Sequence, residues 1–226
     1  MGITVISVGG SLIVPDKINT SWIRKFASLV QQQVRKGNKI ILVTGGGRTA
    51  RSYQNAARET GNLVRDDLDW LGIHTTRLNA HLFRAVFRKI AHPKIVKDPT
   101  KRIPWKEKVL VAAGWKPGWS TDYIAVLLAK KFKAKEVLNL SNIDYAYDKD
   151  PKKYKNAKKL EEVSWKDFRK IVGNKWDPGL NAPFDPVASR IAQQAKLKVV
   201  IMNGSNLPNL ASYLRGQEYK GTKIEK

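Results

Sequence analysis

The chain has 226 residues, which is enough for one large α/β domain with a buried core. It carries 42 Lys and Arg against 19 Asp and Glu, a net charge of +23 that attracts polyanions, and nucleic-acid binding is kept as an open alternative. The absence of cysteine excludes disulfides, thiolate catalysis and cysteine-ligated zinc. No apolar run approaches the roughly 20 residues that span a bilayer, and no secretory signal precedes the first predicted strand, so we expect a cytoplasmic protein with no membrane partner.

The first half of the chain alternates apolar runs with amphipathic segments. Residues 3–8 predict a strand, and a helix capped by Asn19, Thr20 or Ser21 follows and stops at Gly37. Residues 39–44 predict a second strand, which leads into a helix. The periodic segment 66–90 predicts a long helix over the sheet, with Trp70 in the core. Three prolines within residues 93–105 predict an irregular crossing with a short strand.

The second half continues this alternation. The predicted strands are 109–113, 136–140, 198–203 and a final edge strand at Gly221-Thr222, and the predicted helices begin after Ser120 or Thr121, after Ser164, at Asp185-Pro186 and at Leu207. Strand and helix in alternation predict one α/β domain, residues 1–226, with a mostly parallel central sheet and helices on both faces.

Three of the predicted strands end in glycine-rich loops: Gly9-Gly10-Ser11, Gly45-Gly46-Gly47 and the segment 114–122. Consecutive glycines are kept chiefly where φ must be positive or where a ligand lies against the main chain. The carboxyl ends of parallel strands share one edge of the sheet, so these loops place three sets of amide donors together. Their spacing matches neither the P-loop nor the dinucleotide-binding fingerprint.

The central loop, 114–122, joins a predicted strand to a predicted helix. The start of that helix has unpaired amides and partial positive charge, and Lys116 adds a cation, so this loop can receive an anion. An ordinary strand-to-helix turn with a capping hydroxyl is the alternative for this loop taken alone. Phosphoryl transfer needs amide donors, cations and Mg²⁺ rather than a nucleophilic side chain, which suits this composition.

Six short motifs, in this order along the chain, resemble those of the amino acid kinase superfamily and, within it, of the archaeal type of uridylate kinase. They are Gly9-Gly10-Ser11, Gly45-Gly46-Gly47 with Arg51, Asp69 to Ile73 with Thr76 to Ala80, Pro117 to Asp122, Asn142 to Asp144 with Tyr147 and Asp150-Pro151, and Gly221-Thr222. The resemblance covers residues 3–224. It implies a three-layer αβα sandwich that phosphorylates UMP with ATP and Mg²⁺ and assembles as a homo-oligomer, a hexamer by resemblance. It also implies an acceptor lobe at about 1–135 and an ATP lobe at about 136–226.

The resemblance also assigns residues to the two substrates. The acceptor UMP would be bound by Gly46, Asp69, Trp115, Lys116, Pro117, Gly118, Trp119, Ser120 and Thr121, with Asp69 on the ribose hydroxyls. ATP would be bound by Gly9, Gly10, Gly47, Arg51, Ser141, Tyr147 and Asp150. The expected catalytic residues are Arg51, Lys116 and Asp122, where Arg51 is the first choice for a phosphate contact because its planar fork matches phosphate oxygens. No protein metal site is expected, since Mg²⁺ arrives with ATP.

Three positions depart from the family pattern. Ser7 stands where many members have a lysine, Trp115 stands where many have threonine, and Tyr145 stands where glycine is usual. The last substitution requires a turn that avoids positive φ. Two alternatives to UMP phosphorylation therefore stay open: another kinase of the superfamily with a different acceptor, and a nucleotide-sensing or RNA-binding regulator.

Overall fold

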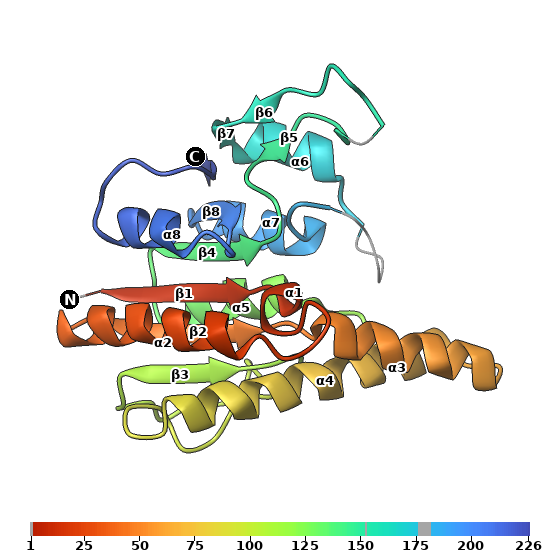
Figure 1. Ribbon diagram of the computed structural model, residues 1–226. Helices are drawn as coiled ribbons and strands as arrows, with labels where there is room; N and C mark the ends of the chain where they lie inside the picture. Colours follow the sequence, from red (N-terminus) through yellow and green to blue (C-terminus); the bar gives the residue numbers. More distant parts are fainter. Residues whose placement is uncertain (1, 152, 176–181) are drawn as a thin grey trace.

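The computed structural model describes residues 2–151, 153–175 and 182–226, which form one three-layer αβα sandwich (Figure 1). Its strands are β1 Ile3–Val8, β2 Lys39–Thr44, β3 Val109–Ala112, β4 Glu136–Ser141, β5 Ala146–Tyr147, β6 Lys159–Leu160, β7 Glu162–Ser164, β8 Lys198–Asn203 and β9 Thr222–Glu225. Its helices are α1 Gly10–Ile13, α2 Thr20–Arg35, α3 Gly47–Thr60, α4 Arg65–Val86, α5 Thr121–Lys131, α6 Trp165–Val172, α7 Pro186–Gln194 and α8 Leu207–Leu214.

The main sheet has seven strands in the order β3-β2-β1-β4-β8-β9-β7. The five strands from β3 to β8 are parallel, and β9 runs antiparallel to β8. The chain leaves β1 toward β2 and β3 on one side and returns to β4 on the other. The strand order therefore reverses between β1 and β4, and in open α/β sheets ligands bind at the carboxyl edge of such a switch point.

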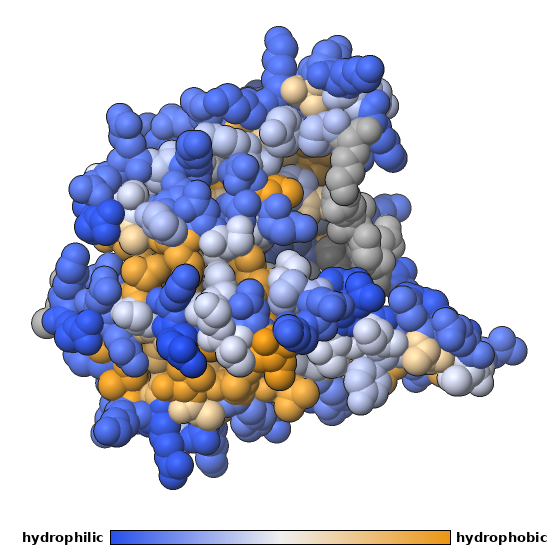
Figure 2. Space-filling view, in the orientation of Figure 1, coloured by the Kyte–Doolittle hydropathy of each residue, from blue (hydrophilic) through white to orange (hydrophobic). Residues whose placement is uncertain are grey.

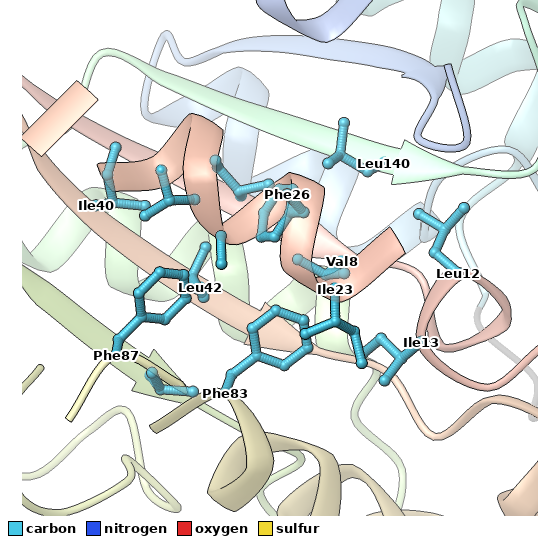
Figure 3. Packing of buried hydrophobic residues seen from close by; sticks show 14 of the residues in the cluster. Val8, Leu12, Ile13, Ile23, Phe26, Ile40, Leu42, Phe83, Phe87 and Leu140 are labelled. Carbon is cyan, nitrogen blue, oxygen red and sulfur yellow. The ribbon is translucent and has the colours of Figure 1, made fainter. Parts of the chain in front are cut away.

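Alternating side chains of the strands divide the core into two halves. One half packs under α2, α4 and α8 and joins Val8 and Leu42 to Phe26, Phe83 and Leu140 (Figure 3). The other half packs under α5, α6 and α7 around the buried Trp165 and Phe168. The parallel strands are buried on both faces, which is why their sequences read as nearly continuous apolar runs.

The predicted helix boundaries are confirmed where a capping side chain marks them. The side chains of Asn19, Ser120, Ser164 and Asp185 each accept a hydrogen bond from an amide in the first turn of α2, α5, α6 and α7. Each cap satisfies one of the amides that a helix start leaves unpaired. These helix starts are therefore set by side chains within three residues of the first turn.

Several details differ from the sequence predictions. The predicted edge strand at Gly221-Thr222 is wrong in position, because β9 lies inside the sheet and β7 forms the edge. The predicted short strand within residues 93–105 is reduced to an isolated bridge between Val96 and Ala112. Trp70 is not a core residue, since 40% of it is exposed on α4. Tyr145 avoids positive φ, as the turn required.

The helices that cover the sheet also shape its surroundings. α3 and the first half of α4 pack on each other and project beyond the carboxyl edge of the sheet (Figure 1). None of the helices in the described ranges is long and apolar enough to span a membrane.

Candidate active site

The loops after β1 and β2 touch each other through their main chains. A Cβ atom at Gly10 would lie 2.0 Å from the amide nitrogen of Gly47, and one at Gly47 would lie 2.3 Å from the carbonyl oxygen of Gly10. Gly47 also has φ of +69°, a conformation that favours glycine. The predicted glycine cradles of β1 and β2 are therefore one continuous surface of main chain.

The same surface continues to β4. The amide of Gly9 donates to the carbonyl of Leu140 over 2.8 Å, and a Cβ at Gly9 would lie 3.5 Å from the Cα of Ser141. The main chain thus runs in contact from Ser141 through Gly9 and Gly10 to Gly47 across the switch point.

Beside Ser141 a pocket of about 520 Å³ opens between the β5 region and α6. Its lining includes Ser141, Tyr147 and Asp150, the three residues that the resemblance placed around adenosine and ribose. The apolar side chains of Ile143, Ile171 and Val172 form part of its wall, which is suited to a flat aromatic base.

The central loop lies on the other side of the glycine cradle and is held by α4. The amide of Gly114 donates to Thr76 Oγ1 over 2.8 Å, and the amide of Gly118 donates to Asp69 Oδ2 over 2.8 Å. The resemblance assigns Asp69 to the ribose of UMP. In this structure the Asp69 carboxylate accepts a hydrogen bond from the central loop.

Aromatic side chains line the central loop. The rings of Trp115 and Trp119 lie 6.0 Å apart, and those of Trp119 and Tyr123 lie 4.1 Å apart. The ammonium of Lys116 lies over the ring of Trp115, 4.3 Å from its centroid, and is otherwise exposed. These rings offer a stacking surface for a base beside an exposed cation.

The start of α5 follows the central loop directly. Ser120 Oγ accepts a hydrogen bond from the amide of Tyr123, and Ser120 also bonds to the Asp185 side chain at the start of α7. Thr121 is the first residue of α5, so its amide belongs to the unpaired donors of that helix end. Two helix starts therefore meet at this point of the sheet edge.

Asp122 is partly buried in the first turn of α5, against β1 and β4. Its Oδ1 accepts hydrogen bonds from Ser7 Oγ over 3.0 Å and from Asn139 Nδ2 over 2.8 Å. Burial, together with the neighbouring Asp185 carboxylate, raises the pKa of Asp122 to about 7. Asp122 therefore links α5 to β1 and β4 at the switch point, and the Ser7 hydroxyl is one of its two hydrogen-bond donors.

Arg51 lies apart from these contacts, exposed on α3 one turn beyond Gly47. Gly46 caps α3 beside the glycine cradle, and a Cβ there would lie 2.7 Å from Thr75 Oγ1 on α4. Apart from Gly46, the predicted acceptor residues lie in or beside the central loop. The predicted ATP residues lie in the glycine cradle, around Ser141 and, for Arg51, on α3.

The sequence analysis assigned no site role to four polar residues that bond to the loops or to Asp122. Arg77 and Asn79 on α4 bond to loop carbonyls, and Ser7 and Asn139 bond to Asp122. A buried polar residue within an apolar strand was the available signal for Ser7 and Asn139, because such groups are normally paired.

Comparison with known proteins agrees with this geometry. The model of the Amino acid kinase family matches residues 2–203. The uridylate kinase of Pyrococcus abyssi is 34% identical, with 98% of each chain covered, and that of Thermococcus sibiricus is 33% identical, also with 98% of each covered.

Solved structures of uridylate kinases are also similar to this chain. The crystal structure of uridylate kinase from Archaeoglobus fulgidus superposes with a TM-score of 0.83 at 32% identity, covering 99% of this chain and all of that one. The UMP kinase of Bacillus anthracis, 19% identical with a TM-score of 0.78, shares the fold, covering 99% of this chain and 95% of that chain. The chain belongs to the amino acid kinase family and is similar along its whole length to the archaeal uridylate kinases within it.

Proposed function

We propose that the protein is a UMP kinase, which transfers the γ-phosphoryl group of ATP to UMP and releases UDP and ADP. The observation that carries this proposal is the unbroken main-chain surface from the Ser141 pocket through Gly9, Gly10 and Gly47 toward the central loop, in a chain whose full-length relatives are uridylate kinases. Such a surface lets two phosphorylated molecules meet end to end.

The chemistry follows from alignment and charge. A phosphate oxygen of the acceptor is already ionised near neutral pH and attacks the γ-phosphorus without a general base, while the β–γ bridging oxygen of ATP leaves with ADP. Amides at Gly10 and Gly47, together with the start of α5, stabilise charge on the group in transit. Arg51 and Lys116, whose side chains are exposed, supply positive charge to the phosphates when the substrates bind.

Mg²⁺ enters this scheme bound to ATP, where it neutralises phosphate charge. Within the described ranges, His, Cys, Asp and Glu side chains form no group of three that could hold a metal ion. In the proposed division of the chain, residues up to about 135 form the acceptor lobe, whose glycine loops also contact ATP, and those from about 136 form the ATP lobe.

A coupled assay with ATP and each of the four ribonucleoside monophosphates tests the proposal. We expect ADP formation with UMP far above that with AMP or GMP, and CMP serves as the closest competitor. Turnover with another acceptor and none with UMP would overturn the assignment while leaving the family unchanged.

Asp69→Asn separates the two substrates. Removing the charge weakens bonds to ribose hydroxyls and to Gly118, so we expect UMP affinity to fall about tenfold, the scale of a hydrogen bond to a charged group. ATP affinity changes little. Calorimetry with each nucleotide measures both, and Asp66→Asn, which removes an exposed charge three residues earlier, is the matched control. Equal losses for UMP and ATP would remove Asp69 from the acceptor site.

We also propose that the protein assembles as a homo-oligomer. Apolar side chains are exposed between α2 and α4, where Ile18 is 54% and Val86 is 38% exposed, and Leu82 lines a groove between them (Figure 2). Exposed apolar patches of this kind mark interaction surfaces. Light scattering should show an oligomer for the wild type and a smaller species for Ile18→Asp with Val86→Asp. Exposed Leu63→Asp, outside this groove, should leave the mass unchanged.

A further inference from the structure

Two side chains of α4, Arg77 and Asn79, donate hydrogen bonds to the two loops that would bind the phosphates. Asn79 Nδ2 donates to the carbonyl oxygens of Gly45 over 2.7 Å and Gly46 over 3.3 Å. Arg77 donates to the carbonyl oxygens of Trp115, 2.8 Å from Nη2, and Gly114, 3.4 Å from Nε. Each side chain therefore binds two consecutive carbonyls of a different loop.

Because peptide groups are planar and trans, these hydrogen bonds to carbonyls also fix the direction of the neighbouring N–H groups. The carbonyl of one residue and the N–H of the next belong to the same peptide plane and point in opposite directions. Because Asn79 holds the carbonyls of Gly45 and Gly46, the N–H groups of Gly46 and Gly47 point away from it. By the same geometry Arg77 turns the N–H groups of Trp115 and Lys116 away from α4.

Within the part of the chain that the structure describes, none of these four N–H groups has a protein acceptor. The nitrogens of Gly46 and Gly47 lie beside Gly10 at the switch point, since a Cβ there would stand 2.7 and 2.0 Å from them. Unpaired amides at a ligand edge are expected to bind anionic oxygens.

Both side chains are themselves held in place. Asn79 is buried, and its neighbour Thr76 fixes the amide of Gly114. The guanidinium of Arg77 lies over the ring of the exposed Trp70, 5.7 Å from its centroid, so this ring supports the position of the guanidinium. A side chain locked by packing holds its partners within the narrow tolerance that catalysis needs.

We propose that Arg77 and Asn79 are positioning residues: from one helix they preset the peptide planes of two loops, so that four amides face the phosphates before substrate arrives. The role rests on the proposed phosphoryl transfer, and neither residue touches the reacting atoms. Arg77 serves the acceptor loop, whereas Asn79 serves Gly46 and Gly47, where acceptor and donor would meet.

The test compares Arg77→Met, which keeps the chain length over Trp70 but loses both donors, with Asn79→Leu, which keeps the shape of the amide without its N–H. Arg88→Met removes a cation from an exposed position just beyond α4 and is the matched control. Steady-state kinetics with UMP and ATP and thermal unfolding are measured for each variant.

We expect Arg77→Met to raise KM for UMP about tenfold or more, with KM for ATP within about twofold of the wild type. Asn79→Leu should instead lower kcat about tenfold or more. Arg77→Lys keeps the charge but lacks the planar fork, so it should restore only part of the UMP affinity, and it serves as the second variant where Arg77→Met unfolds.

A KM for UMP that matches Arg88→Met, or equal loss of both substrates at unchanged melting temperature, would overturn the inference. If the wild type makes no UDP, the proposed function fails instead. The inference is then judged by calorimetric binding of inorganic phosphate, which probes the amides alone. Weaker phosphate binding by Arg77→Met supports the inference, and no difference between it and the wild type contradicts it.

Discussion

Gly10→Ala should reduce turnover at least about a hundredfold, although it adds a single methyl group. The new Cβ would stand 2.0 Å from the nitrogen of Gly47, a distance that real Cβ atoms do not reach, and the obstacle is main chain that cannot rotate away. The β1 and β2 loops must therefore separate. Displacing their amides by about 1 Å is enough for a loss of this size.

Stability should fall with activity, by about 1–3 kcal/mol, the usual range for overpacking. Denaturant unfolding and the coupled assay measure the two effects on one preparation. Gly61→Ala is the control, because a Cβ there meets nothing within 4 Å and its φ of 179° suits any residue. Near-normal turnover in Gly10→Ala would show that the two loops do not form one rigid cradle.

Asp122→Asn should change how stability depends on pH. The pKa of Asp122 is raised from 3.8 to about 7, so between these values the folded protein holds a proton that the unfolded chain releases. The free energy of unfolding of the wild type therefore falls as pH rises through this window and stays lower above it. Asparagine has no proton to release, so the variant should be more stable above pH 7, by an amount on the order of a few kcal/mol.

Denaturant unfolding of both proteins at intervals from pH 4 to pH 8 measures the difference. The control is Asp66→Asn, an exposed carboxylate at the start of α4, whose curve should run parallel to that of the wild type. Parallel curves for Asp122→Asn and the wild type would mean that Asp122 is charged in the folded protein.

Much of the fold could be predicted because its signals are local. The apolar runs of β1, β2 and β8 and the caps Asn19, Ser164 and Asp185 each need only a few neighbouring residues to act. β9 could not be placed inside the sheet in the same way, because this position depends on its parallel pairing with β7, about 60 residues earlier in the chain. Trp70 was misplaced because helical periodicity does not tell which side of a projecting helix meets the core.

The element types, the family and the glycine loops at strand ends can all be read from the amino-acid sequence, since they follow from residue chemistry over short spans. Which loops touch is set by folding, because the contact of Gly10 with Gly47 exists once β1 and β2 pair. Folding also brings Asp122 against Ser7 and lets Arg77 and Asn79 reach loop carbonyls. A side chain's partner and pKa are set by distances between segments remote in sequence, and those distances arise only on folding.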